Sequence, residues 1–243
     1  ELSHISFSYN EQVVLEDVDM HIPAKSFIAL VGPSGSGKTT ITRLIARFWD
    51  PDAGKISLGG RDLRDYTIDA LLSQIAVVFQ DVYLFHDTIK NNILIGKEDA
   101  TDAEIEAAAR KAQCHDFIMK LPKGYDTEVG EGGSSLSGGE KQRISIARAI
   151  LKEASIVLLD EATASLDPEN EIHIQEAISQ LVKDKTVVVI AHRLWTVREA
   201  DQIYVLDKGR VVQHGKHDEL LAQTEGVYRH LWDEQQRIKG WKF

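Results

Sequence analysis

The sequence has little cysteine and no long uninterrupted apolar stretch. Its single cysteine, Cys114, excludes an intramolecular disulfide and is typical of a protein from a reducing compartment. The longest apolar runs, such as residues 187–191, fall far short of the ~20 residues that a membrane-spanning helix needs, and no signal peptide is visible. These features exclude a small disulfide-stapled scaffold and give no sign of a span within the 243 residues.

Positive charge is also scarce. Lysine and arginine number 28 against 38 aspartates and glutamates, which gives a formal net charge of −10. A protein that binds nucleic acid through bulk positive charge is therefore excluded, and we expect no nucleic-acid partner. The length suits one large domain or two small ones. The chain begins at Glu1 without methionine and enters a strand pattern almost at once, which suggests a piece of a longer protein or a processed N-terminus.

One glycine-rich stretch, residues 32–39, fits the phosphate-binding pattern G-x-x-x-x-G-K-[ST]. A tight glycine-rich loop lets backbone N–H groups converge on a phosphate, and the following helix adds its positive dipole end. Lys38 can reach the β- and γ-phosphates, and the Thr39 hydroxyl can bind Mg²⁺. A buried strand precedes the loop at 27–31. An amphipathic helix is expected after it, from the spacing of Ile41, Leu44, Ile45 and Phe48.

Short strands and helices alternate along the rest of the chain. Strand pairs are predicted within 2–31, with a turn at Asn10, and as hairpins within 55–63 and 202–213. Further buried strands are predicted at 75–79, 155–159 and 186–191. Helices are predicted at 102–119, 141–151, 170–181 and, interrupted near Gly226, at 219–239; 124–135 is expected to be a loop.

Four buried runs end in residues suited to a ligand site: Gly32, Gln80, the pair Asp160 and Glu161, and His192. Ligands bind at the carboxyl ends of strands in open parallel sheets, so these residues are expected to form one site. Two adjacent carboxylates at the end of an apolar strand cost free energy unless a cation lies beside them. Mg²⁺ is a suitable cation for Asp160. Glu161 can orient or deprotonate a water. A lone histidine such as His192 is either structural or catalytic.

For two further residues, Tyr9 and Ser137, the residue by itself allows a structural and a binding interpretation. Tyr9 either packs in its strand or offers its aromatic face to a base such as adenine. Ser137 is a plausible N-cap for the helix at 141–151, and the same helix start could bind an anion.

Taken together, these residues resemble the nucleotide-binding domain of ATP-binding cassette (ABC) transporters over essentially the whole chain. The most specific element is the signature-like loop at 136–140; Gln80 matches the Q-loop, 156–160 the Walker B strand and 165–167 the D-loop. The resemblance implies that Tyr9 stacks on adenine, Glu161 is the catalytic carboxylate, His192 contacts the γ-phosphate, and Lys38 and Gln80 assist catalysis. The implied sites are as follows: ATP at Tyr9, Gly32, Pro33, Ser34, Gly35, Ser36, Gly37, Lys38, Thr39 and Thr40; Mg²⁺ at Thr39, Gln80 and Asp160; the signature at Leu136, Ser137, Gly138, Gly139 and Glu140; and the D-loop at Ser165, Leu166 and Asp167.

The same resemblance implies an α/β fold with a RecA-like parallel-sheet core, an antiparallel β subdomain and an α-helical signature subdomain. Core and β subdomain would cover about 1–85 and 154–220, the helical part about 86–153, and C-terminal helices about 217–243. The family implies a head-to-tail homo- or heterodimer in which Ser137 and Gly139 face the γ-phosphate bound to the partner's Lys38. The segments 82–93 and 127–133 look exporter-type, as in bacterial half-transporters. This branch implies a transmembrane domain, usually in the same polypeptide, and a place on the cytoplasmic face of a membrane.

Several competing functions fit the sequence less well. A GTPase would carry N-K-x-D, which is absent, and a phosphotransferase leaves 136–140 unexplained. A non-transport ABC ATPase of DNA repair or ribosomes usually has a coiled-coil insertion or a second cassette, and neither is in these residues. A module that binds without hydrolysing ATP is disfavoured by Glu161 and His192. Glu140 and Gly132 depart from a common Gln and a frequent Arg without removing a phosphate contact.

Overall fold

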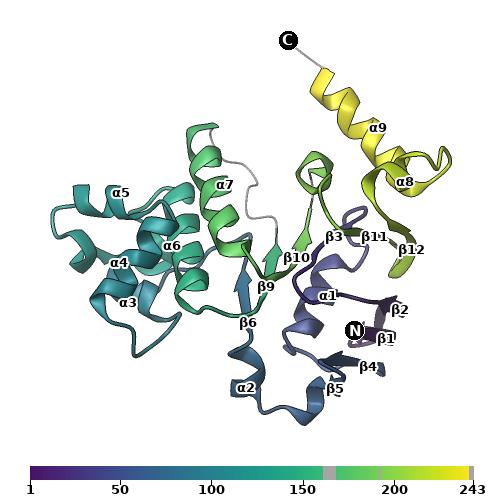
Figure 1. The fold of residues 1–243 in the computed structure, drawn as a ribbon, viewed down its shortest axis with the longest axis horizontal. Coiled ribbons are helices and arrows are strands. Elements are labelled where there is room, and N and C mark those ends of the chain that lie inside the picture. Colours follow the sequence, from purple (N-terminus) through teal and green to yellow (C-terminus); the bar gives the residue numbers. More distant parts are fainter. Residues whose placement is uncertain (161–167, 192, 241–243) are drawn as a thin grey trace. The chain divides into compact units, whose positions relative to one another are not determined.

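The computed structural model describes residues 1–160, 168–191 and 193–240, and the chain divides into two compact units (Figure 1). Unit 1 comprises residues 1–72 and 186–243, and unit 2 comprises residues 73–185. Each unit is described by itself. No helix among the described residues is long and apolar enough to cross a membrane.

Unit 1 contains an antiparallel sheet in the order β2-β1-β4-β5. Its strands are β1 (Leu2–Tyr9), β2 (Gln12–Met20), β4 (Ala53–Leu58) and β5 (Arg61–Asp62). Leu2, Ile5 and Phe7 are buried on one side of β1, and Asn10 has the positive φ of 54° that suits a tight hairpin turn. The predicted strand pair and the hairpin within 55–63 are confirmed.

The second set of strands in unit 1 has the order β12-β11-β3-β10. The central strand β3 (Phe27–Val31) runs parallel to β10 (Thr186–Ile190) on one side and β11 (Gln202–Asp207) on the other, and β12 (Arg210–Gly215) closes the β11 edge antiparallel. Burial on both faces explains the near-continuous apolar sequence of these strands. Their core includes Ala29, Val31, Ile203, Val205 and Tyr228.

Helix α1 (Lys38–Ile45) follows the glycine-rich loop directly, as predicted, and buries Ile41, Leu44 and Ile45. The prediction that Phe48 continues this apolar stripe is wrong, because Phe48 lies beyond the helix and is 49% exposed. Arg47 adopts a φ of 54°, which ends the helical path one residue earlier. The connection to β6 contains the turn η1 (Leu63–Asp65) and helix α2 (Ile68–Leu72).

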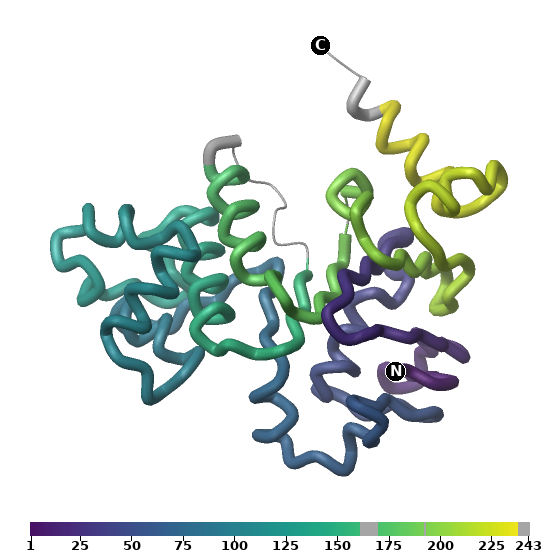
Figure 2. Tube along the Cα trace, viewed as in Figure 1, coloured from purple at the N-terminus to yellow at the C-terminus, as the bar shows by residue number. Residues whose placement is uncertain are grey.

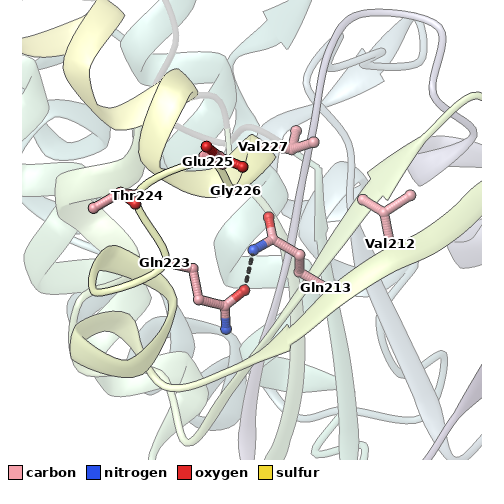
Figure 3. Close-up of a pocket in the computed structure, with 7 residues that line it drawn as sticks. All are labelled: Val212, Gln213, Gln223, Thr224, Glu225, Gly226 and Val227. Carbon is pink, nitrogen blue, oxygen red and sulfur yellow. Dashed lines mark hydrogen bonds between the residues drawn. The ribbon is translucent and has the colours of Figure 1, made fainter.

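The C-terminal part of unit 1 contains the turn η4 (Leu194–Val197) and two helices, α8 (His217–Leu221) and α9 (Val227–Gly240). The interruption between the helices falls at Gly226, as predicted. Figure 3 shows the shallow pocket beside it, in which the Gln213 side chain donates to the Gln223 amide oxygen. The Gln213 oxygen also accepts from the Tyr228 N–H, so Gln213 fixes the start of α9 on β12.

In its described residues, unit 2 combines the parallel strands β6 and β9 with a group of helices, and Figure 2 follows it along the chain from blue to green. Strand β6 (Ile75–Val78) pairs with β9 (Ile156–Asp160) from Ile75 opposite Ile156 to Val78 opposite Leu159. Helix α6 (Gly138–Leu151) packs against its neighbours in this unit. These are α3 (Ile89–Leu94), α4 (Asp102–Lys111) and α7 (Pro168–Val182).

One long helix had been predicted over 102–119, and the structure has two. α4 and α5 (His115–Lys120) are separated where Gln113 takes a φ of 55°. The segment predicted as a loop at 124–135 holds only the short turns η2 (Gly124–Asp126) and η3 (Glu131–Gly133) and the two-residue strand β8 (Glu128–Val129), paired with β7 (Asp87–Thr88).

Candidate functional site

The predicted phosphate loop forms the turn between β3 and α1. The side chain of Lys38 folds back over the loop instead of extending into solvent, and the residue is only 5% exposed. Its Nζ donates to the carbonyl oxygens of Gly32 and Pro33 at 2.9 and 2.7 Å and to the Ser36 hydroxyl at 3.3 Å. The loop thus holds a buried ammonium group among its own oxygens, which is a ready cationic contact for a phosphate.

Glycine is required at the first position of this loop. Gly32 has a φ of 147°, and an added Cβ would overlap the carbonyl oxygen of Leu206. At the other end, Gly37 is the N-cap of α1 and has no side chain that could cap the helix. A hydroxyl or carboxylate cap therefore does not compete with a phosphate at this helix start.

The hairpin between β11 and β12 contacts the phosphate loop, a contact that the sequence did not reveal. The Gly209 N–H donates to the Ser36 carbonyl at 3.3 Å, and the Gly209 carbonyl accepts from the Glu16 N–H at 2.9 Å. Gly209 thereby joins the phosphate loop to β2. Only its turn chemistry, as part of the Lys208-Gly209 pair, was visible in the sequence.

Tyr9 ends β1 and is half-buried, with two aromatic neighbours. The Phe7 and Trp49 rings lie 4.8 and 5.6 Å from it, centroid to centroid, both nearly perpendicular to its plane. The Arg43 guanidinium on α1 reaches the Tyr9 hydroxyl at 3.4 Å. Tyr9 is therefore packed and yet partly accessible, and its stacking on adenine stays a prediction.

In unit 2, two predicted site residues follow neighbouring parallel strands. Asp160 is the last residue of β9, directly after the buried Leu158 and Leu159, and is half-buried. Gln80 is exposed two residues beyond the end of β6. Because Val78 lies opposite Leu159, both side chains belong to the carboxyl edge of this strand pair, as expected for a ligand site.

The predicted signature loop leads into α6, and Ser137 is its N-cap, as predicted. The Ser137 hydroxyl accepts from the Glu140 N–H at 3.3 Å, while the Glu140 carboxylate accepts from the Ser137 N–H and hydroxyl, both at 2.8 Å. Gly139 is buried against Asn170, where an added Cβ would collide with that side chain. Asn170 in turn accepts from Arg143 at 2.7 Å. Leu136 is half-buried, and Ser137 and Gly138 remain exposed.

The segment that follows Gln80 contains both buried and exposed apolar side chains. Leu84 and Ile89 are fully buried, whereas Tyr83 and Phe85 are 51% and 54% exposed and meet edge-on at 5.3 Å. Arg148 of α6 donates to the Tyr83 carbonyl at 2.9 Å and to the side-chain and backbone oxygens of Asn92. Burial lowers the pKa of Arg148 to about 10. Helix α6 therefore holds the segment that follows Gln80 in place.

Several predicted residues lie outside the described part of the chain. These are the catalytic candidates Glu161 and His192 and the D-loop residues Ser165, Leu166 and Asp167. For the implied Mg²⁺, each unit offers suitable chemistry by itself. Thr39 supplies a hydroxyl in unit 1, and Asp160 and Gln80 supply carboxylate and amide oxygens in unit 2, which are the hard donors that Mg²⁺ prefers.

Comparison with known proteins identifies the family. The family model described as "ABC transporter" matches residues 15–164. The chain belongs to the ABC transporter family. It is 51% identical over 229 residues to an ATP-dependent lipid A-core flippase of Syntrophus aciditrophicus, covering 94% of this chain and 38% of that protein. It is 49% identical over 234 residues to a putative multidrug export ATP-binding/permease protein of Staphylococcus aureus, covering 96% and 40%.

A solved structure agrees with these relatives. The bacterial Atm1-family ABC exporter with ATP bound superposes with a TM-score of 0.91 at 44% identity, covering 96% of this chain and 41% of that one. The chain thus spans about two fifths of the length of the proteins it matches. The similarity confirms the α/β phosphate-loop NTPase fold and the exporter-type ABC assignment. The chain is an ABC ATPase domain, which binds and hydrolyses ATP.

Proposed function

We propose that this ATPase domain powers the export of a substrate by a longer membrane protein, through Mg-ATP hydrolysis and ATP-driven head-to-tail dimerisation. The observation that carries the proposal is the phosphate loop, in which the buried Lys38 ammonium sits on the Gly32 and Pro33 carbonyls at the start of α1. The similarity to exporters over 96% of the chain supports the transport role.

The chemistry is assigned as follows. Tyr9 stacks on adenine, residues 32–40 bind the phosphates, and Thr39, Asp160 and Gln80 hold Mg²⁺. The metal, when bound, neutralises phosphate charge. Glu161 accepts a proton from the attacking water, whose oxygen bonds to the γ-phosphorus while the bond to the bridging oxygen breaks. His192 contacts the γ-phosphate, and Lys38 stabilises the charge that develops on it.

The dimer explains why the signature loop resembles a second anion site. In a head-to-tail pair, Ser137 and Gly139 of one subunit face the γ-phosphate that the partner's loop holds. Ser137 and Gly138 are exposed at the start of α6 and are thus accessible to a partner.

The partner in the longer protein is a transmembrane domain, and the ATPase domain then works at the cytoplasmic face. The exposed pair Tyr83 and Phe85 offers an apolar contact for a short helix of that domain. The single-domain organisation predicted above, with a helical part at about 86–153, remains part of this proposal. A non-transport ATPase is disfavoured, because the matched relatives are named as exporters or flippases.

Replacing Glu161 with Gln tests the catalytic assignment. The amide keeps the shape of the carboxylate but cannot accept the proton, so Mg-ATP turnover should collapse while ATP binding persists. Turnover by steady-state phosphate release and binding by calorimetry measure the two effects. Glu153→Gln, an exposed acid of the same unit, is the control. Turnover as fast in Glu161→Gln as in wild type rejects the role.

A further inference from the structure

Trp49 is a large apolar side chain left 53% exposed in the connection between α1 and β4, and it lies against Tyr9. We propose that Trp49 is a positioning residue for the base of the bound nucleotide, because it holds the Tyr9 ring in the orientation needed for stacking. The inference rests on the proposed function, which gives Tyr9 that role.

The chain path places Trp49 there through defined contacts. After α1, the positive φ of Arg47 turns the backbone, and the Phe48 N–H donates back to the Arg43 carbonyl at 2.9 Å. Three residues beyond Trp49, the Asp52 N–H donates to the Ser6 carbonyl of β1, also at 2.9 Å. The segment that carries Trp49 is therefore fixed at both ends, one to α1 and the other to the strand that carries Tyr9.

The rings of Phe7, Tyr9 and Trp49 contact one another. Tyr9 meets Phe7 at an interplanar angle of 89° and Trp49 at 86°, and Phe7 and Trp49 are 6.2 Å apart. Edge-to-face contacts of this kind are favourable and directional. Phe7 is only 3% exposed and belongs to the core, whereas Trp49 stays 53% exposed although it contacts both rings. Its contact with Tyr9 places an aromatic ring beside the residue proposed to stack on the base.

The polar end of Tyr9 is tied to the phosphate site. Arg43 reaches the Tyr9 hydroxyl at 3.4 Å and lies on α1 five residues after Lys38. At 1.5 Å of rise per residue, this is about 7.5 Å along the helix. One helix therefore carries both Arg43, which contacts the Tyr9 hydroxyl, and Lys38, which is assigned to the phosphates. The contact links the position of the Tyr9 ring to the helix that begins at the phosphate loop.

The consequence is a selective effect on affinity. A ring that is already held loses less freedom when a base stacks on it, so the Trp49 contact favours nucleotide over phosphate alone. Trp49→Ala should weaken binding of Mg-ATP by about twofold to tenfold, the range that one aromatic pair supports. Binding of inorganic triphosphate, which has no base, should not change.

Calorimetric titration of the 243-residue chain with Mg-ATP and with Mg-triphosphate tests this. Trp49→Tyr keeps an aromatic edge and should restore ATP affinity. Trp49→Leu keeps apolar volume without the ring; it should behave like Trp49→Ala, and it replaces that variant if Trp49→Ala fails to fold. Ile68→Ala removes a side chain of similar exposure elsewhere in unit 1 and should leave the affinity for both ligands unchanged.

Equal weakening of ATP and triphosphate would overturn the inference, since Trp49 would then support the loop and not the ring. Unchanged affinity for ATP in both Trp49→Ala and Trp49→Leu would overturn it as well. Tyr9→Ala separates the two levels of the account. If Tyr9→Ala weakens ATP binding and the Trp49 variants do not, only this inference fails; if Tyr9→Ala has no effect, the proposed role of Tyr9 fails first.

Discussion

At the scale of single residues, the phosphate loop shows how a motif becomes a binding geometry. The sequence predicted the roles of Lys38 and the glycines because the spacing alone fixes a loop whose amides and lysine converge. It did not reveal that Lys38 is buried on the Gly32 and Pro33 carbonyls, nor that Gly209 supports Ser36. The Gly209 contact joins residues far apart in the chain, and the Lys38 bonds depend on the folded path of the loop, so the spacing of the motif specifies neither.

Removing the Lys38 ammonium group should therefore weaken the binding of ATP strongly. Lys38→Ala deletes a charge-assisted contact to the phosphates, which is worth about 1.5–3 kcal/mol, so the Kd for Mg-ATP should rise by roughly tenfold to a hundredfold. Lys55→Ala, an exposed lysine on β4, is the control and should bind ATP normally. Calorimetry measures both, and an unchanged Kd in Lys38→Ala would contradict the assigned role.

Trp49 and Arg43 mark the limit of residue-level prediction at this site. Tyr9 was singled out because an aromatic residue can stack on a base, but a tyrosine at the end of a strand fits packing as well as stacking. Its edge contacts depend on the turn at Arg47, where a non-glycine residue has a φ of 54°. Such conformations carry little sequence signal outside glycine and asparagine.

At the scale of elements, periodicity predicted the helices and strands well and their ends poorly. The strands β3, β6, β9 and β10 were found because burial on both faces leaves apolar runs, and α6 because Ser137 caps it. The errors at Phe48 and within 102–119 share one cause. Arg47 and Gln113 end or break a helix with positive φ where no glycine or proline signals a stop.

The contact between α8 and α9 should make the C-terminal helices sensitive to acid. His217 is buried, and its Nδ1 lies 2.7 Å from the Tyr228 hydroxyl. Burial lowers the pKa of His217, Arg198 lowers it further, and Asp218 and Glu199 oppose them. The unfolded chain then binds more protons than the folded chain below the ordinary pKa of 6.5, so stability is complete above it and falls as the pH drops further.

Chemical denaturation at pH 7.5 and pH 5.5 measures this effect. Wild type should lose more unfolding free energy between the two pH values than His217→Gln, which cannot titrate but can still bond to Tyr228. The other histidines titrate in both proteins and cancel in the comparison. An identical pH dependence in the two proteins would show that His217 does not contribute.

At the scale of the whole molecule, residues predicted to bind the nucleotide occur in each of the two units. Unit 1 contains the phosphate loop and Tyr9, and unit 2 contains Gln80, Asp160 and the signature loop. The sequence predicted that polar residues follow the carboxyl ends of parallel strands, and β6 and β9 bear this out within unit 2. The relatives extend the picture, because the chain matches only about two fifths of their length.

The surface after Gln80 should connect the domain to the rest of the longer protein. In that protein, Tyr83→Ala and Phe85→Ala should reduce transport, because both exposed side chains are available to a partner. The 243-residue chain carrying the same changes should keep its ATPase activity and thermal stability. Leu84→Ala is the matched contrast: Leu84 lies between them, is fully buried, and should cost about 2–5 kcal/mol of stability. Loss of stability in the Tyr83 or Phe85 variants would assign them to the core.

Dimerisation requires a test that separates the cap from the phosphate contact at Ser137. Aspartate can accept from the Glu140 N–H as serine does. It gives up the hydroxyl bond to the Glu140 carboxylate, but the packing of α6 against α4 and α7 should keep the helix folded in Ser137→Asp. It also places a negative charge at the proposed contact with the partner's γ-phosphate, where it is repelled. The two roles of Ser137 therefore diverge in this variant.

Sedimentation of the Glu161→Gln chain in saturating Mg-ATP and in Mg-ADP tests the account most directly, since this form binds ATP without discharging it. We predict a dimer with Mg-ATP, a monomer with Mg-ADP, and a folded monomer in both when Ser137→Asp is added. A monomer at saturating Mg-ATP, or a dimer that survives Ser137→Asp, would contradict the account.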